Sequence, residues 1–197
     1  MPETLRALFP EIHFMTHQFD EEKATQVATF FASRLGGQIN YTKLMKLFYL
    51  TDREAFKRWG RPVVGGPYVA MDNGPVSSPA YDAVKPANAA RFPLWSSVFR
   101  KAGYDLEVLR SIELNAISKA EIEILESIFS QFGSWSQWDL VHYTHVNCGE
   151  WHDPQGTSVP IPEETILENV GLEQEQIAVL MDEKKRYRIA HSHFQKA

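Results

Sequence analysis

The chain has 197 residues, of which 44% are hydrophobic and 12% aromatic, and its formal net charge is −5. A chain of this length buries roughly 70% of the surface that its unfolded form exposes, so it can build a core without disulfides or metals. The single cysteine, Cys148, cannot form an internal bridge, and no run of about 18 apolar residues occurs, which excludes a membrane-spanning helix. The negative charge disfavours a dedicated nucleic-acid binder. The first residues contain no secretory apolar run, so we expect a cytoplasmic protein.

The first half of the chain predicts two helices after an N-terminal extension over residues 1–19. Asp20 can cap a helix over 21–35, which Gly36 and Gly37 would end. Asn40 opens a longer helix, over about 41–59, ended by Gly60. Its apolar residues recur at helical spacing and spread beyond one face, which predicts a central helix contacted on two sides. They are Leu44, Met45, Leu47, Phe48, Tyr49, Ala55, Phe56 and Trp59.

The segment from Gly60 to Pro79 is irregular, with four glycines and four prolines. Tyr68–Met71 is a plausible short strand, and Asn73–Gly74 suits the positive φ angles of a tight turn. Pro75 then removes a backbone donor, and Ser78–Pro79 is typical of a helix start. We therefore expect a strand, a sharp turn and a helix rather than a regular hairpin.

The second half predicts further helices. Residues 94–101 suit a helix, and the alternation over 104–112 is compatible with a strand. Ser118 with Glu121 forms a capping-box pattern before a helix over 119–132, and Ser136 begins another that carries Trp138. A polar loop precedes helices near 163–170 and 173–193. The sequence predicts a mainly α (α+β) fold, as one compact domain over 1–197 with a small β element near 67–76 and a C-terminal helix in 173–197.

Charge is unevenly distributed near the C-terminus. Seven acids and no Lys or Arg lie between Glu163 and Glu183, whereas five bases and no acid lie between Lys184 and Lys196. The bases suit the last turns of a helix, whose dipole they complement. A basic tail for an acidic partner such as RNA is the alternative.

Catalytic signatures are absent: the chain contains no G-x-S-x-G elbow, P-loop, dinucleotide fingerprint or H-E-x-x-H motif. The best metal candidates are His142, His145, Cys148 and His152, since two histidines three apart share a helix face. The alternative is that they are surface and core residues. Cys148 with a histidine and Glu150 is also compatible with a nucleophilic pair. We expect neither catalysis nor a cofactor.

Two parts of the sequence resemble the Panacea domain of SocA-like antitoxins. The first is a K-L-x-K-L-x-Y helix, a glycine-bearing loop, an aromatic-Ala segment, G-P-V and a tyrosine. The second is a T-H…W element after Leu140. The residues that carry the resemblance are Lys43, Leu44, Lys46, Leu47, Tyr49, Gly74, Pro75, Val76, Tyr81, His145 and Trp151.

The resemblance implies an antitoxin that neutralises a cognate toxin by direct protein contact, with delivery of the toxin to a cytoplasmic protease in some relatives. It implies no catalytic residue or cofactor. Binding hot spots favour aromatic and arginine side chains. The irregular segment therefore predicts five candidate contact residues: Trp59, Arg61, Tyr68, Asp72 and Asn73.

Overall fold

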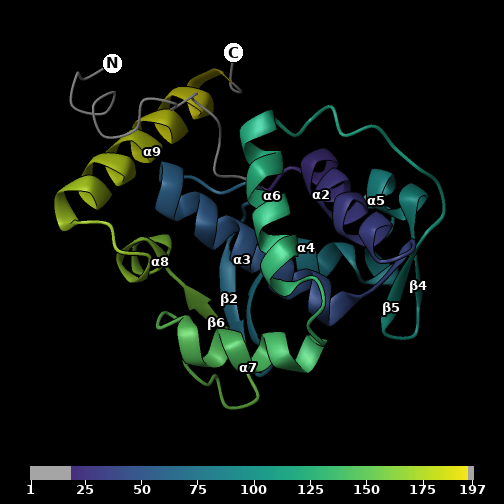
Figure 1. Cartoon of the computed structure of the whole chain (residues 1–197). Coiled ribbons are helices and arrows are strands. Elements are labelled where there is room, and N and C mark those ends of the chain that lie inside the picture. The colour runs from purple at the N-terminus through teal and green to yellow at the C-terminus, as the bar shows by residue number, and fades with distance from the viewer. Residues whose placement is uncertain (1–18, 195–197) are drawn as a thin grey trace.

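The computed structural model describes residues 19–194, with side chains described as far as Tyr187 (Figure 1). The predicted extension over 1–19 therefore lies outside the described residues except for Phe19. The helices are α2 (Glu21–Arg34), α3 (Tyr41–Trp59), α4 (Ser78–Ala83), α5 (Pro93–Val98), α6 (Lys119–Phe132), α7 (Gln137–Asn147), α8 (Glu163–Asn169) and α9 (Gln174–Phe194). The strands are β1 (Gln38–Asn40), β2 (Tyr68–Met71), β3 (Gly74–Ser77), β4 (Phe99–Ala102), β5 (Asp105–Val108) and β6 (Val159–Ile161). The fold is mainly α with small antiparallel sheets, as predicted.

Helix α3 is the centre of the molecule. The Asn40 side chain accepts hydrogen bonds from the first-turn amides, and Gly60 ends the helix in the left-handed conformation, with φ of 68°. Every residue from Leu44 to Asp52 is buried, so no side of this stretch faces solvent. Helices α2, α6, α7 and α8 and strand β3 pack around it. The prediction of a central helix is confirmed.

Strands β2 and β3 form a hairpin across the Asp72–Asn73 turn, so the expectation of a strand and a turn without a hairpin is wrong. Pro75 is tolerated because β3 is an edge strand in the order β3-β2-β6. Backbone groups of alternate residues in an antiparallel ladder point away from the partner strand. The Pro75 carbonyl accepts from the Lys46 ammonium at 2.8 Å, which places it on that outer side.

Helix α4 follows β3 directly, with Ser77 rather than Ser78 as its N-cap residue. The Ser77 hydroxyl donates to the Gly65 carbonyl at 2.7 Å and makes no cap hydrogen bond. The serine therefore ties the hairpin to the glycine-rich loop.

A second sheet has the order β1-β5-β4 and lies to the right in Figure 1. The predicted helix over 94–101 stops at Val98, because Phe99–Ala102 forms β4 and pairs with β5. Strand β5 covers residues 105–108, in the first half of the predicted 104–112 segment. Strands β1 and β6 were not predicted, since three residues carry too little periodicity to signal a strand.

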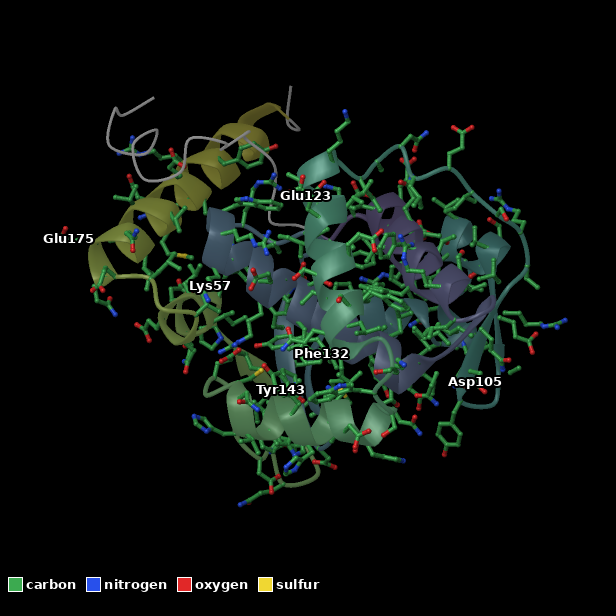
Figure 2. The ribbon with its side chains drawn as sticks, viewed as in Figure 1. Lys57, Asp105, Glu123, Phe132, Tyr143 and Glu175 are labelled. Atoms are coloured by element: carbon green, nitrogen blue, oxygen red, sulfur yellow. The ribbon has the colours of Figure 1, made fainter. Side chains whose placement is uncertain are left out.

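Helices α6 and α7 begin with the two predicted capping boxes, at Ser118 and Ser136. An aromatic cluster joins them: the rings of Phe132 and Tyr143 have centroids 4.9 Å apart, and Trp135 packs edge-on against both. Figure 2 shows Phe132 and Tyr143 facing one another between the two helices. This cluster fixes the position of α7.

Helix α9 lies along the outside of α8 and the end of α3 (Figure 1). Leu180 packs against Gly60, where a Cβ would meet the leucine Cδ1 at 2.6 Å. Lys184 pairs with Glu163 of α8, and Arg186 pairs with Asp182. The first bases of the C-terminal run thus meet acids within the chain. Among the described residues, no helix is long and apolar enough to cross a membrane.

Candidate functional site

The site begins with four polar residues on α3, Lys46, Tyr49, Asp52 and Arg53, which recur at helical spacing. Three of them are buried, and Arg53 is half-buried. Burial of polar groups is costly unless each finds a partner. Asp52 and Lys46 reach two different segments of the chain, and Tyr49 and Arg53 both reach Glu150.

Asp52 holds the glycine-rich loop. Its carboxylate accepts hydrogen bonds from the backbone amides of Val63, Val64 and Gly65 at 2.7–3.0 Å and from the Tyr68 hydroxyl at 2.9 Å. Burial raises the pKa of Asp52 to about 6, and these hydrogen bonds oppose the rise. The loop is therefore fixed onto α3. Sequence reasoning missed Asp52, although an acid within a buried helical arc before a glycine-rich loop is the signal that points to it.

Lys46 holds the hairpin. Its ammonium donates to the Pro75 carbonyl, and burial lowers its pKa to about 7. Gly74 lies against it: a Cβ at Gly74 would meet Lys46 Nζ at 3.0 Å and Thr144 Oγ1 at 2.7 Å. Lys46 of the K-L element thus contacts Gly74 and Pro75 of the G-P-V element. Thr144 of α7 lies against the same glycine.

Glu150 joins α3 to the segment after α7. It accepts from the Tyr49 hydroxyl at 2.7 Å and from Arg53 Nε at 2.8 Å. Arg53 also donates to the Asn169 carbonyl of α8 at 3.2 Å. Burial and the neighbouring carboxylate raise the pKa of Tyr49, so it stays a hydrogen-bond donor. Sequence reasoning missed this network, because Glu150 and Arg53 are far apart in the chain.

The T-H…W element lies against the β2–β3 turn. Trp151 Nε1 donates to the Met71 carbonyl at 3.0 Å, and the Trp151 indole stacks on His145 with centroids 3.7 Å apart. Burial and the nearby Lys46 lower the pKa of His145, which favours the neutral form of its ring. Its Nε2 is buried with no hydrogen-bond partner among the described residues. The T-H…W element therefore packs against the β2–β3 turn and holds it through the Trp151 hydrogen bond.

The remaining motif residues are also structural. Leu44, Leu47 and Val76 are core residues, and Lys43 Nζ donates to the Gly133 carbonyl at 2.7 Å. Lys85 Nζ lies over the half-buried Tyr81 ring, 4.4 Å from its centroid.

The five candidate contact residues do not form one patch. Tyr68 is only 3% exposed and donates to Asp52, so its side chain lies inside the molecule. Trp59 and Arg61 lie at the C-terminal end of α3, where the Arg61 guanidinium covers the Trp59 ring and pairs with Glu121. Asp72 and Asn73 are exposed at the hairpin turn, next to Gly74, which lies against Lys46. Trp59 lies about 20 Å further along α3 than Lys46.

The four metal candidates are not brought together. No group of three His, Cys, Asp or Glu side chains within the described part of the chain could hold a metal ion. His142 and His152 are exposed, whereas Cys148 is buried. Burial raises the pKa of the Cys148 thiol to about 12, and Glu150 is occupied by Tyr49 and Arg53. The arrangement therefore supplies no activated thiol.

Comparison with known families supports this assignment of the motif. The family model "Antitoxin SocA-like, Panacea domain" matches residues 44–152, which is more than half of the chain. The match contains the α3 helix, the glycine-rich loop, the hairpin and the T-H…W element, all of which the structure joins through Lys46, Asp52 and Trp151. No curated protein and no solved structure matches the chain. The chain belongs to the Panacea domain family of SocA-like antitoxins.

Proposed function

We propose that the chain neutralises one cognate toxin by direct protein contact in the cytoplasm, and that it acts by binding rather than by catalysis. The observation that carries the proposal is the family match over residues 44–152. It spans two segments that are distant in the sequence and that form one framework around α3.

The framework has the properties that a binding protein needs. Buried polar side chains tie the loop, the hairpin and the segment after α7 to one helix, so their exposed residues are held in fixed positions. Binding by a rigid surface costs less conformational entropy than binding by a mobile one. Asp72 and Asn73 project from this framework at the hairpin turn, while Asp72 Oδ1 accepts from the Gly156 amide at 2.9 Å.

Co-expression tests the proposal. The product of the reading frame next to the gene is induced alone and together with this chain, and growth is recorded. We expect growth arrest by the neighbour alone and recovery when the chain is present. A neighbour that is harmless alone, or that still arrests growth with the chain present, contradicts the proposal.

Toxin abundance in the same cells separates two mechanisms. Occlusion of the toxin leaves its level unchanged, and a complex of the two proteins can be purified. Delivery to a protease lowers the toxin level, and deletion of the protease restores it. We expect a stable complex, because the chain presents a rigid surface.

A further inference from the structure

Helix α7 presents an exposed apolar ridge on the side that faces away from the body of the molecule. Trp138 is 61% exposed and Val146 is 66% exposed, and the exposed His142 lies one turn from each. The opposite side of the helix is buried through Leu140 and Thr144. Figure 1 shows α7 along the lower edge of the molecule, with α3 and α6 above it.

The ridge is not needed to hold α7 in place. The aromatic cluster of Phe132, Trp135 and Tyr143 and the buried side of the helix already fix its position. Hot spots of protein interfaces favour Trp, and neighbouring apolar side chains exclude water around it. Trp138 and Val146, about 12 Å apart along the helix, have the spacing of two anchors on one helix face.

The segment that contains the ridge is acidic in sequence, although its Glu121, Glu150 and Glu163 pair with bases inside the molecule. None of the chain's 20 Lys and Arg residues lies between Ala120 and Glu183, a stretch that contains 13 acids and forms α6, α7, α8 and the first part of α9.

Three exposed acids lie close to the ridge. Asp139 follows Trp138 in the chain and interacts electrostatically with His142. Asp153 interacts electrostatically with His145. The third acid is Asp72, whose backbone forms a hydrogen bond with the His145 ring. Two lysines lie nearby, and each is engaged by a backbone carbonyl: the buried Lys46 donates to Pro75 and the half-buried Lys43 donates to Gly133. The ridge therefore presents the apolar side chains of Trp138 and Val146 on either side of His142, with exposed acids beside it.

We infer that the Trp138–His142–Val146 ridge of α7 is the docking surface for the cognate toxin, and that the toxin presents a basic face with an apolar pocket for the Trp138 indole. The inference rests on the proposed function and names the surface and the partner's charge. Complementary charge around an apolar centre accelerates association and selects the partner.

The first test is binding of the purified neighbour product to the wild-type chain and to Trp138→Ala. We expect the dissociation constant to rise at least about thirtyfold, as for a hot-spot residue. Tyr104→Ala is the matched control, because Tyr104 is an aromatic residue that is 71% exposed on the β4–β5 turn. It should bind like the wild type. Circular dichroism confirms that both variants fold.

The second test removes charge without removing hydrogen bonds. Asp72 Oδ1 accepts a hydrogen bond from the Gly156 amide, and Asp153 Oδ1 accepts one from the Gln155 amide. An asparagine oxygen can accept the same bonds. The double variant Asp72→Asn, Asp153→Asn should slow association several-fold and change dissociation little, and added salt should reduce this difference.

The outcomes separate the inference from the proposed function. No growth protection by the wild type overturns the proposed function, and the inference falls with it. Protection by the wild type with unchanged binding by Trp138→Ala overturns the inference alone. A third outcome is that the wild type is a dimer, that Trp138→Ala is a monomer, and that neutralisation is unchanged. The ridge would then bind a second copy of the chain, and the inference would be overturned.

Discussion

Lys46 makes the stability of the protein depend on pH. The ammonium is buried, and its pKa falls from 10.5 to about 7. Below about pH 7 the folded and unfolded chains both carry the proton, so the full cost of burying the charge is present. As the pH rises toward 10.5, the folded chain is neutral while the unfolded chain still binds a proton. Stability therefore increases with pH, by up to about 1.4 kcal/mol per pH unit and by about 5 kcal/mol over the whole range.

Lys46→Met removes this titration and keeps an unbranched side chain of similar length. It also leaves the Pro75 carbonyl without its donor, which costs about 1 kcal/mol at every pH. Urea unfolding of both proteins at a series of pH values gives the free energy of unfolding. We expect the wild type to gain about 1 kcal/mol per pH unit relative to the variant between about pH 7.5 and about pH 9.5.

Lys57→Met is the matched control, because Lys57 is an exposed lysine on the same helix (Figure 2). Its pH profile should run parallel to that of the wild type. Parallel profiles for Lys46→Met as well would refute the reasoning, since the buried ammonium would then titrate as it does in the unfolded chain.

Two further pairs of variants test the contacts that assemble the motif. Gly74→Ala should lose about 3 kcal/mol of stability and Gly37→Ala about 1 kcal/mol, because both need a positive φ but only Gly74 faces close neighbours. Equal losses in urea unfolding would mean that the contact with Thr144 can relax. Glu150→Gln should lose about 2–4 kcal/mol, because it leaves the half-buried Arg53 without its carboxylate. Glu54→Gln, in an exposed pair, should lose less than about 0.5 kcal/mol in thermal unfolding, and a similar loss for Glu150→Gln would contradict the reasoning.

The sequence was most informative where local rules decide the structure. The bounds of α3 and α6 and the start of α7 follow from caps at Asn40, Ser118 and Ser136 and from helical spacing of apolar residues, and the structure confirms them. The family could also be recognised, because its pattern combines a helix with a glycine-proline turn. These features depend on residues a few positions apart.

The errors arose where distant segments meet. The hairpin was not predicted, because Pro75 disfavours a strand unless it lies at an edge, and the edge position depends on β2 and β6 pairing across the chain. The burial of Tyr68 was not predicted, because its partner Asp52 lies on another element.

The grouping of the candidate contact residues was also decided by the tertiary structure. Asp72 and Asn73 lie near α7, whose His145 contacts the Asp72 backbone. Trp59 and Arg61 lie at the C-terminal end of α3, near Glu121 of α6. Trp138 was visible in the sequence as one residue of a short helix. Its exposure became evident only once the opposite side of α7 was seen to be buried.

The sequence by itself thus determined the helices, their caps and the family, because those depend on short-range periodicity and on a local motif. Tertiary structure alone decided which polar residues of α3 hold which loop, and which face of α7 remains exposed. The physical reason is that hydrogen bonds such as Tyr49 to Glu150 and Lys46 to Pro75 join positions separated by 101 and 29 residues. No local rule of sequence relates residues at such separations.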